Sequence, residues 1–423
     1  MQVLTHGMWG NPLHVRHLER IIQDTIPGPD LHVLRAQTNR EENTYDGIDW
    51  GGERVAVEIV DEVAKLQREG RTVTRFSITG YSLGGLVARY VVGILHQRGF
   101  FEHITPVNFN TIATPHIGVP RYPSFVSSLA SFIGPRLLSR TGEQFFCVDK
   151  WSPNGRALLE VMADPDRIFY QALAAFETIR IYANAINDVT VPYLTAAIEV
   201  EDPFIARASN GLEVELDDKY TPLVKSFTVP LIPPPPTPKP AVLSRSWFKS
   251  LKLRPFIPPP LQYRFPLNLV VYTLLPVLIP VFMSLAICRL AVASHSSRAR
   301  IRLLERDAAS PGSAEKLAHV LARLEQQVES AVVELINEPT TTMADPEQSP
   351  SKTRPAAKDH PRLTQAQRRI VANLNTLPLK KELAFLPNLR NAHGTIVCRD
   401  LENFEFQRQG EGIVRHWASV FVL

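Results

Sequence analysis

This chain contains few cysteines and carries only a small net charge. Three cysteines in 423 residues, Cys147, Cys288 and Cys398, stand far apart, and no two of them form a C-x-x-C pair. This spacing argues against a disulfide framework and against a zinc site, and it fits a reducing compartment. A formal net charge of +4 gives no reason to expect a nucleic-acid partner. We therefore expect no metal, no other cofactor and no nucleic acid.

The N-terminus also lacks the pattern of a secretory leader. Met1 to Leu4 has the composition of a strand, which leaves no room for the apolar core of a signal peptide. Because this strand is short, we expect the natural chain to start further upstream.

What the sequence does contain is a serine framed by glycines, in Gly80-Tyr81-Ser82-Leu83-Gly84-Gly85. A β-prone run precedes it and a helix-prone run follows, which is the pattern of a nucleophile elbow. Such a turn strains the serine backbone, so only very small side chains fit two residues to either side of it. An ordinary tight turn is the alternative reading. The flanking strand and helix favour the elbow, with Ser82 as a nucleophile.

Strands and helices alternate through the first half of the chain. Strands are expected at residues 3–5, 31–34, 73–79, 107–112 and 179–185, with amphipathic helices between them. The alternation predicts an α/β fold, with a mostly parallel sheet and helices on both faces. The apolar stretch 120–170 interrupts this alternation. It is interpreted either as a cap over an apolar pocket or as a helical excursion that completes the core.

A serine hydroxyl needs a base to take its proton, and the base needs an acid to orient it. With a nucleophile elbow, the acid follows the serine in the chain and the histidine comes last. Asp188 directly follows the strand expected at 179–185, which favours it as the acid. Asp164 and Asp166 follow no strand and are weaker candidates.

Two histidines late in the chain are candidates for the base. His393 lies in a loop ahead of the terminal helix, which is the favoured place. His416 falls inside that helix, where a packing role is expected. The developing oxyanion needs two backbone N–H donors, for which Leu83, after the nucleophile, and Met8, after the first strand, are suitably placed.

Four motifs together resemble the fungal serine-esterase family of lipases, which includes lipid-droplet phospholipases. They are His6-Gly7-Met8-Trp9-Gly10, Gly80-Tyr81-Ser82-Leu83-Gly84-Gly85, Ala113-Thr114-Pro115-His116-Ile117-Gly118 and Ala392-His393-Gly394-Thr395-Ile396. The resemblance covers 1–207 and 363–423 and leaves the middle of the chain unmatched. It implies an α/β-hydrolase fold and hydrolysis of acyl esters in lipids.

The middle of the chain has a different composition. Prolines gather at 233–240 and 258–260, and residues 265–288 carry no charge, with basic residues on both sides. The apolar run is long enough to cross a membrane, although a buried core helix is the alternative. The predicted division is 1–207 and 363–423 for the two parts of the hydrolase domain, 208–264 for a proline-rich linker, 265–288 for a membrane-associated segment, and 289–362 for a helical and disordered insertion.

The order of the candidate residues limits how the apolar run can meet a membrane. Ser82 and Asp188 precede the run and His393 follows it, so a single crossing would separate base from nucleophile. We therefore expect a hairpin that turns near Pro276 and Pro280 and returns to the same side. Such a hairpin suits the cytosolic face of the endoplasmic reticulum or the monolayer of a lipid droplet.

The leading hypothesis is a membrane-associated carboxylic-ester hydrolase, a phospholipase or acylglycerol lipase with a Ser-Asp-His triad. Its partners would be a lipid substrate and a membrane or lipid-droplet surface. An acyl thioesterase or an acyltransferase would use the same residues. A catalytically silent membrane tether is the alternative from another class.

Overall fold

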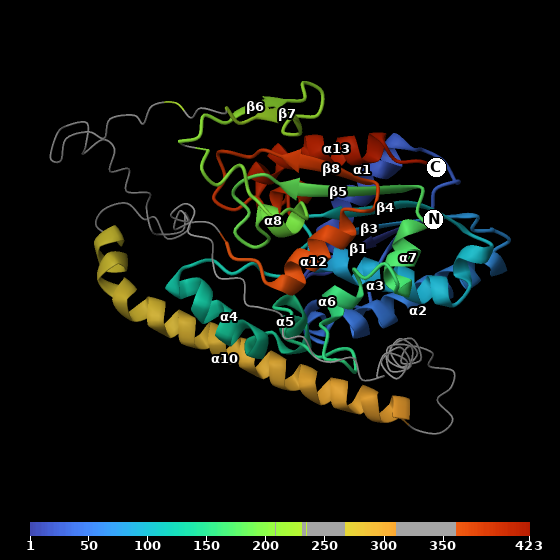
Figure 1. Ribbon diagram of the computed structural model, residues 1–423, viewed down its shortest axis with the longest axis horizontal. Helices are drawn as coiled ribbons and strands as arrows, with labels where there is room; N and C mark the ends of the chain where they lie inside the picture. The colour runs from blue at the N-terminus through green and yellow to red at the C-terminus, as the bar shows by residue number, and fades with distance from the viewer. Residues whose placement is uncertain (208, 231–233, 235–266, 310–360) are drawn as a thin grey trace, which may run out of the picture.

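The computed structural model describes residues 1–207, 209–230, 234, 267–309 and 361–423. Six parallel strands form one sheet, in the order β2-β1-β3-β4-β5-β8 (Figure 1). The strands are β1 (Gln2–Thr5), β2 (Val33–Arg35), β3 (Arg75–Tyr81), β4 (Thr105–Ile112), β5 (Thr178–Asn184) and β8 (Leu379–Ala384). The predicted mostly parallel α/β-hydrolase sheet is confirmed.

Helices cover both faces of this sheet (Figure 1). One face carries α1 (Arg16–Thr25) and α13 (Glu411–Ser419), which pack against each other over one apolar cluster. The other face carries a larger apolar cluster, to which the short helix α6 (Leu158–Val161) and four further helices contribute. The four are α2 (Ile48–Arg68), α3 (Leu83–Gln97), α7 (Ile168–Ala174) and α12 (Gln365–Leu374).

Other helical segments lie between these elements along the chain. The α-helical ones are α4 (Phe125–Leu137), α5 (Ser139–Phe145), α6 (Leu158–Val161) and α8 (Tyr193–Ala196). The 3-10 helices are η1 (Pro12–Val15), η2 (Glu41–Tyr45), η3 (Phe100–Glu102), η5 (Thr395–Val397) and η6 (Glu405–Gly410).

The apolar stretch 120–170 combines features of both sequence interpretations. Its later part completes the core, because Leu158, Leu159 and Phe169 are buried in the larger apolar cluster. Its first part does not, since Phe125 and Phe132 of α4 stay largely exposed. Helix α4 is therefore an apolar element on the surface, and the residues after it belong to the body of the domain.

Part of the expected linker 208–264 is folded. Strands β6 (Glu213–Leu216) and β7 (Val224–Thr228) form an antiparallel pair, so this part of the linker prediction is wrong. The pair packs Val214 and Val224 against a small apolar cluster that contains Phe204. The alternation of charged and apolar residues in 213–216 supports a half-buried strand, and proline becomes frequent only afterwards. The remainder, 235–264, lies outside the described residues.

The expected hairpin at Pro276 and Pro280 is also wrong. Both prolines lie inside one continuous helix, α10 (Leu267–Ala309), of 43 residues. A proline in a helix removes one backbone hydrogen bond and bends the axis, whereas reversing the chain needs a turn. Residues 265–288 contain no glycine to make one. The predicted insertion 289–362 is helical up to Ala309, and residues 310–360 lie outside the described part.

A buried carboxyl on α2 makes the stability of the fold depend on pH. Burial raises the pKa of Glu53 from 4.5 to about 9, and the Tyr90 hydroxyl lies 3.5 Å from one of its oxygens. Between these two values the folded chain keeps a proton that the unfolded chain has lost. Stability therefore falls as pH rises through this range. Glu53→Gln, which stays neutral, should gain stability over the wild type by on the order of 1–3 kcal/mol at pH 7.

Urea unfolding of both proteins at pH 4.5 and pH 8 tests this. The advantage of Glu53→Gln should be larger at pH 8. An equal difference at both pH values would mean that Glu53 does not carry the proton.

Candidate active site

Ser82 stands between β3 and α3, at the carboxyl end of a strand near the middle of the sheet. Its backbone has φ 56° and ψ −126°, a strained combination for a residue other than glycine. A Cβ added at Gly80 would lie 2.4 Å from Gly85 Cα, and one at Gly84 would lie 2.4 Å from the Thr5 carbonyl oxygen. Backbone therefore occupies the space that side chains would need. The sharp strand-to-helix turn is formed in the way the glycine spacing predicts.

The structure brings Ser82, His393 and Asp188 into one hydrogen-bonded chain. The Ser82 Oγ lies 3.0 Å from His393 Nε2, and His393 Nδ1 lies 3.0 Å from Asp188 Oδ2. All three residues are more than nine-tenths buried. This arrangement allows the imidazole to take a proton from the serine while the carboxylate stabilises the imidazolium that forms.

The Asp188 carboxylate is held by its own loop. Its Oδ1 accepts hydrogen bonds from the Thr190 and Val191 N–H groups, at 3.0 and 2.8 Å. Its Oδ2, which faces the imidazole, also accepts one from the Asn184 side-chain amide at 2.9 Å. With donors on both oxygens, the carboxylate has a fixed orientation toward His393.

Sheet pairing brings the histidine loop to the acid. Strand β8 pairs in parallel with β5, so the loops after these two strands begin at the same edge of the sheet. The Ala392 N–H donates to the Asn187 carbonyl oxygen at 2.8 Å, and the His393 N–H donates to Asn391 Oδ1 at 3.1 Å. The first of these bonds joins residues about 200 positions apart in the sequence, and the second orients His393 within its own loop.

Two residues that support His393 escaped the sequence analysis. The Tyr81 hydroxyl donates to the His393 carbonyl oxygen at 3.0 Å, and the two rings lie 5.1 Å apart. Asn391 accepts the His393 amide proton. Tyr81 lies inside the elbow motif, so its position beside the nucleophile is the one signal that could have drawn attention to it.

The turn after β1 lies directly against the nucleophile. A Cβ added at Gly7 would come within 2.7 Å of Ser82 Cβ and 3.1 Å of its Oγ. Met8 follows in this turn, and Leu83 begins α3, where its N–H has no carbonyl one helical turn back. Both expected oxyanion donors therefore belong to segments that border Ser82.

Helix η2 holds the turn that contains Met8. The Trp9 N–H donates to Thr44 Oγ1 at 3.1 Å, and its indole N–H donates to the Tyr45 hydroxyl at 2.7 Å. Trp9 itself has φ 54°, a conformation that a non-glycine residue adopts only when its surroundings impose it. Thr44 thus restrains the peptide next to Met8.

Replacing Thr44 with valine should loosen this turn. The variant keeps the shape of the side chain but loses the acceptor for the Trp9 N–H. We expect kcat for a soluble ester to fall about tenfold with little change in KM, since a displaced oxyanion donor weakens transition-state binding. Thr44→Ser, which keeps the hydroxyl, is the matched control. Equal kcat values for the two variants would show that the hydroxyl does not position the turn.

The other candidate residues lie elsewhere. His416 faces the Tyr182 hydroxyl, at 3.1 Å, and Asp164 pairs with Arg156 at 2.7 Å. The Asp166 backbone N–H donates to Asp164 Oδ1 at 3.1 Å. Burial lowers the pKa of His6, whose Nδ1 lies 3.1 Å from the Gly7 carbonyl oxygen, so this ring is neutral at pH 7. None of these four residues is hydrogen-bonded to Ser82 within the described part of the chain.

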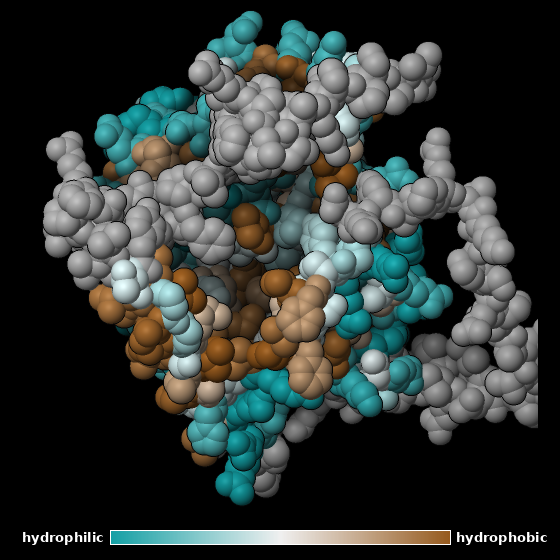
Figure 2. Space-filling view, turned by 90° about the vertical axis from the view of Figure 1, so that its left-hand side faces the viewer, coloured by the Kyte–Doolittle hydropathy of each residue, from teal (hydrophilic) through white to brown (hydrophobic). Residues whose placement is uncertain are grey.

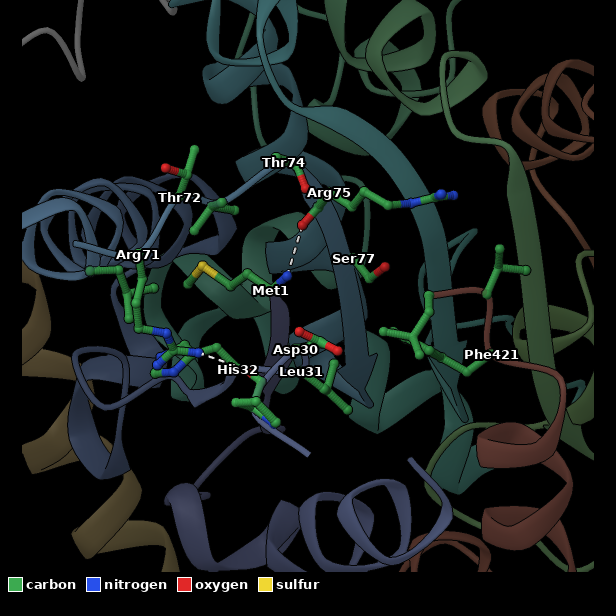
Figure 3. Close-up of a pocket in the computed structure, with 15 residues that line it drawn as sticks. Met1, Asp30, Leu31, His32, Arg71, Thr72, Thr74, Arg75, Ser77 and Phe421 are labelled. Carbon is green, nitrogen blue, oxygen red and sulfur yellow. Dashed lines mark hydrogen bonds between the residues drawn. The ribbon is translucent and has the colours of Figure 1, made fainter. Parts of the chain in front are cut away.

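The nucleophile lies at the edge of the sheet toward which β5 and β8 point in Figure 1. Figure 2 looks onto that side of the molecule and shows a hollow at its centre, with hydrophobic residues along its lower border. A second pocket, drawn in Figure 3, surrounds Met1, whose amino group donates to the Arg75 carbonyl oxygen. Met1 and Arg75 lie at the amino ends of β1 and β3, so that pocket is at the opposite edge of the sheet. Over the described residues, no group of three His, Cys, Asp or Glu side chains is arranged to hold a metal ion.

Residues 1–199 match the protein family described as "Putative serine esterase (DUF676)". The chain is 34% identical over 205 residues to "Putative lipase C4A8.10" of Schizosaccharomyces pombe and 27% identical over 236 residues to "Putative lipase ROG1" of Saccharomyces cerevisiae. These alignments cover 47% and 54% of this chain but only 26% and 33% of the two relatives. The chain thus spans about a third or less of the curated relatives it matches.

Among solved structures, similarity extends to RedJ, a thioesterase from the prodiginine biosynthetic pathway in Streptomyces coelicolor. The structure of RedJ with a polyethylene glycol molecule bound in its active site is 16% identical, with a TM-score of 0.25, over 46% of this chain and 75% of that chain. The fold assignment rests on the sheet order and the elbow. The part of the chain that matches the "Putative serine esterase (DUF676)" family, residues 1–199, contains Ser82 and Asp188.

Proposed function

We propose that this protein is a serine hydrolase that cleaves acyl esters of membrane or storage lipids, as a phospholipase or an acylglycerol lipase. The observation that carries the proposal is the hydrogen-bonded chain from Ser82 through His393 to Asp188. The names of the fungal relatives support lipid esters as the substrate class. So do the hydrophobic residues along the lower border of the hollow above the sheet edge.

In the proposed mechanism, His393 Nε2 takes the Ser82 hydroxyl proton as Oγ attacks the ester carbonyl carbon. The Leu83 and Met8 N–H groups stabilise the negative charge on the carbonyl oxygen. His393 then protonates the leaving alcohol, which departs and leaves an acyl group on Ser82. Water attacks this acyl-enzyme with His393 again as the base, and the fatty acid is released. Asp188 keeps the imidazole oriented throughout.

A fluorophosphonate probe tests the nucleophile. The full chain should be labelled at Ser82, as identified by mass spectrometry of the modified peptide, and an excess of a lipid ester should slow the labelling. A protein that is not labelled at Ser82 would be a tether and not an enzyme.

The substrate class is tested with long-chain substrates. We expect hydrolysis of a phospholipid or a diacylglycerol to exceed that of an acyl thioester. A lysolipid added as acceptor distinguishes hydrolase from acyltransferase, since a transferase would form the diacyl product instead of free fatty acid. We further propose that the protein works on the cytosolic face of the endoplasmic reticulum or on a lipid droplet. Fractionation of cells on a density gradient tests this location.

A further inference from the structure

The amino-terminal half of α10 is an apolar surface that no described part of the protein covers. Over residues 273–288 only Leu275 is even half-buried, and Val277 and Phe282 are 62% and 65% exposed. By length and composition the region Thr273–Arg306 could cross a membrane, and none of its most apolar window is buried. Residues 273–288, here named the apolar arm, therefore do not form a core helix in the described structure.

A second apolar group lies on α4. Phe125, Val126 and Phe132 are 81%, 74% and 65% exposed. Helices α4 and α10 pack side by side (Figure 1), and Ser294 Oγ of α10 donates to the Arg136 carbonyl oxygen of α4 at 2.9 Å. The apolar arm and the first turns of α4 thus belong to one side of the molecule. Patches of exposed aromatic and aliphatic side chains mark surfaces that meet a partner or a membrane.

The carboxyl-terminal half of α10 is fixed on the hydrolase body. Its buried residues Ala293, Ser297 and Ile301 recur at intervals of four, on one helical face. Ser297 Oγ donates to Asp46 Oδ1 at 2.7 Å, and Arg300 pairs with the same fully buried carboxylate at 2.8 Å. The apolar arm is therefore a continuation of a helix whose other half is anchored on the domain.

The chain on the other side of the arm also belongs to this body. Leu223 bridges to Ala384 of β8, and the Phe385 N–H donates to the Pro222 carbonyl oxygen at 2.9 Å. If the arm spanned a bilayer, residues 231–266 would have to cross it back. That segment contains many prolines and the charged residues Arg245, Lys249, Lys252 and Arg254, which makes a crossing costly. The arm can therefore enter only one leaflet.

The dimensions fit this geometry. Sixteen helical residues are about 24 Å long, against about 15 Å for the hydrocarbon of one leaflet, so the arm would enter at an angle. Arg289 directly follows the apolar arm, and Arg298 and Arg302 lie further along α10. Arg136 lies in the last turn of α4, where its guanidinium is 4.5 Å from the Phe132 ring.

Carboxylates near these arginines are few in the described structure. Glu143 lies 3.8 Å from Arg298, and Glu305 pairs with Arg140. Exposed arginines beside an apolar surface favour anionic headgroups.

We propose that the apolar arm and the first turns of α4 form a docking surface for a phospholipid leaflet or monolayer with anionic headgroups. The surface enters one leaflet only and holds the mouth of the active site against the lipid. The apolar end of α10 and the start of α4 lie on the side of Figure 1 that Figure 2 turns to the viewer, the side that contains the hollow. The biological role of this surface rests on the proposed function. The evidence for the surface itself comes from the exposure and contacts of α4 and α10 and does not depend on that function.

Flotation of the full chain with vesicles of 70% phosphatidylcholine and 30% phosphatidylserine tests the surface. Phe125→Asp/Phe132→Asp on α4 and Phe282→Asp/Leu285→Asp on the arm should each lower the vesicle-bound fraction at least tenfold. Val57→Asp/Val60→Asp is the matched control, because these exposed residues lie on α2, outside the surface. Vesicles of phosphatidylcholine alone should bind the wild type several-fold more weakly.

Other outcomes would overturn the proposal. Unchanged flotation of both surface variants would do so. Equal binding of the wild type to neutral and anionic vesicles would overturn the preference for anionic headgroups. If the wild type forms dimers and the arm variant does not, the surface is a contact between two copies of the chain. A protease-protected tag placed before residue 267 in a cell membrane would indicate a full crossing. All variants should hydrolyse a water-soluble short-chain ester as the wild type does. If no protein hydrolyses it and flotation still follows the surface, only the proposed function fails.

Discussion

Ser82→Ala is expected to lower kcat for ester hydrolysis by about 10⁴- to 10⁶-fold, to a rate set by binding and the oxyanion donors alone. The reason is the loss of the oxygen that lies 3.0 Å from His393 Nε2. KM should change little, because the serine oxygen contributes to the reaction more than to substrate binding. The measurement is the rate of fatty-acid release from a short-chain ester and from a phospholipid.

The control is His393→Ala, together with the double variant. Because the two groups act as a unit, His393→Ala should cost nearly as much as Ser82→Ala, and the double variant should cost little more than either. Thermal unfolding of each protein should show an intact fold. A folded Ser82→Ala protein with more than a tenth of wild-type activity would disprove the assignment of Ser82 as nucleophile.

Gly84→Ala is expected to destabilise the protein by on the order of 3 kcal/mol or more and to abolish activity. The new Cβ would lie 2.4 Å from the Thr5 carbonyl oxygen and 2.6 Å from that of His6. Both atoms are backbone, so β1 and α3 would have to separate. This separation would also displace the turn that carries Met8. Chemical unfolding and the soluble-ester assay measure the two effects.

A glycine in open space is the comparison for this variant. Gly70 has φ 79° and no heavy atom within 4 Å of an added Cβ, so Gly70→Ala should cost only about 1 kcal/mol, from backbone strain. Its activity should be unchanged. If Gly84→Ala unfolded at the same denaturant concentration as Gly70→Ala, the close contact with β1 could not be the reason for the glycine.

Local rules predicted the elbow and much of the sheet. The glycines at 80 and 84 follow from steric requirements within a few residues, and the parallel sheet follows from alternating strands and helices. The capped start of α12 at Thr364 also follows from a short pattern, in which Thr364 and Gln367 bond reciprocally. Such features depend on neighbours in the sequence.

Features that depend on distant parts of the chain were harder to predict from the sequence. The expected hairpin at Pro276 and Pro280 is a continuous helix, because nothing between the prolines supplies a turn and α10 is anchored on Asp46, far away in the sequence. The pair β6 and β7 was assigned to a linker because its small apolar cluster includes Phe204 from outside the segment. The exposure of α4 likewise depends on what packs beside it.

The sequence by itself determined the class of fold, the position of the elbow and the order in which serine, acid and histidine occur. Only the tertiary structure decided that Ser82, Asp188 and His393 lie within hydrogen-bonding distance, because the pairing of β8 with β5 brings together loops about 200 residues apart. It also decided the direction of the apolar arm, which is set by the contacts of the other half of α10 with the body. Hydrophobic pattern fixes which residues avoid water, whereas packing between distant elements fixes where they meet.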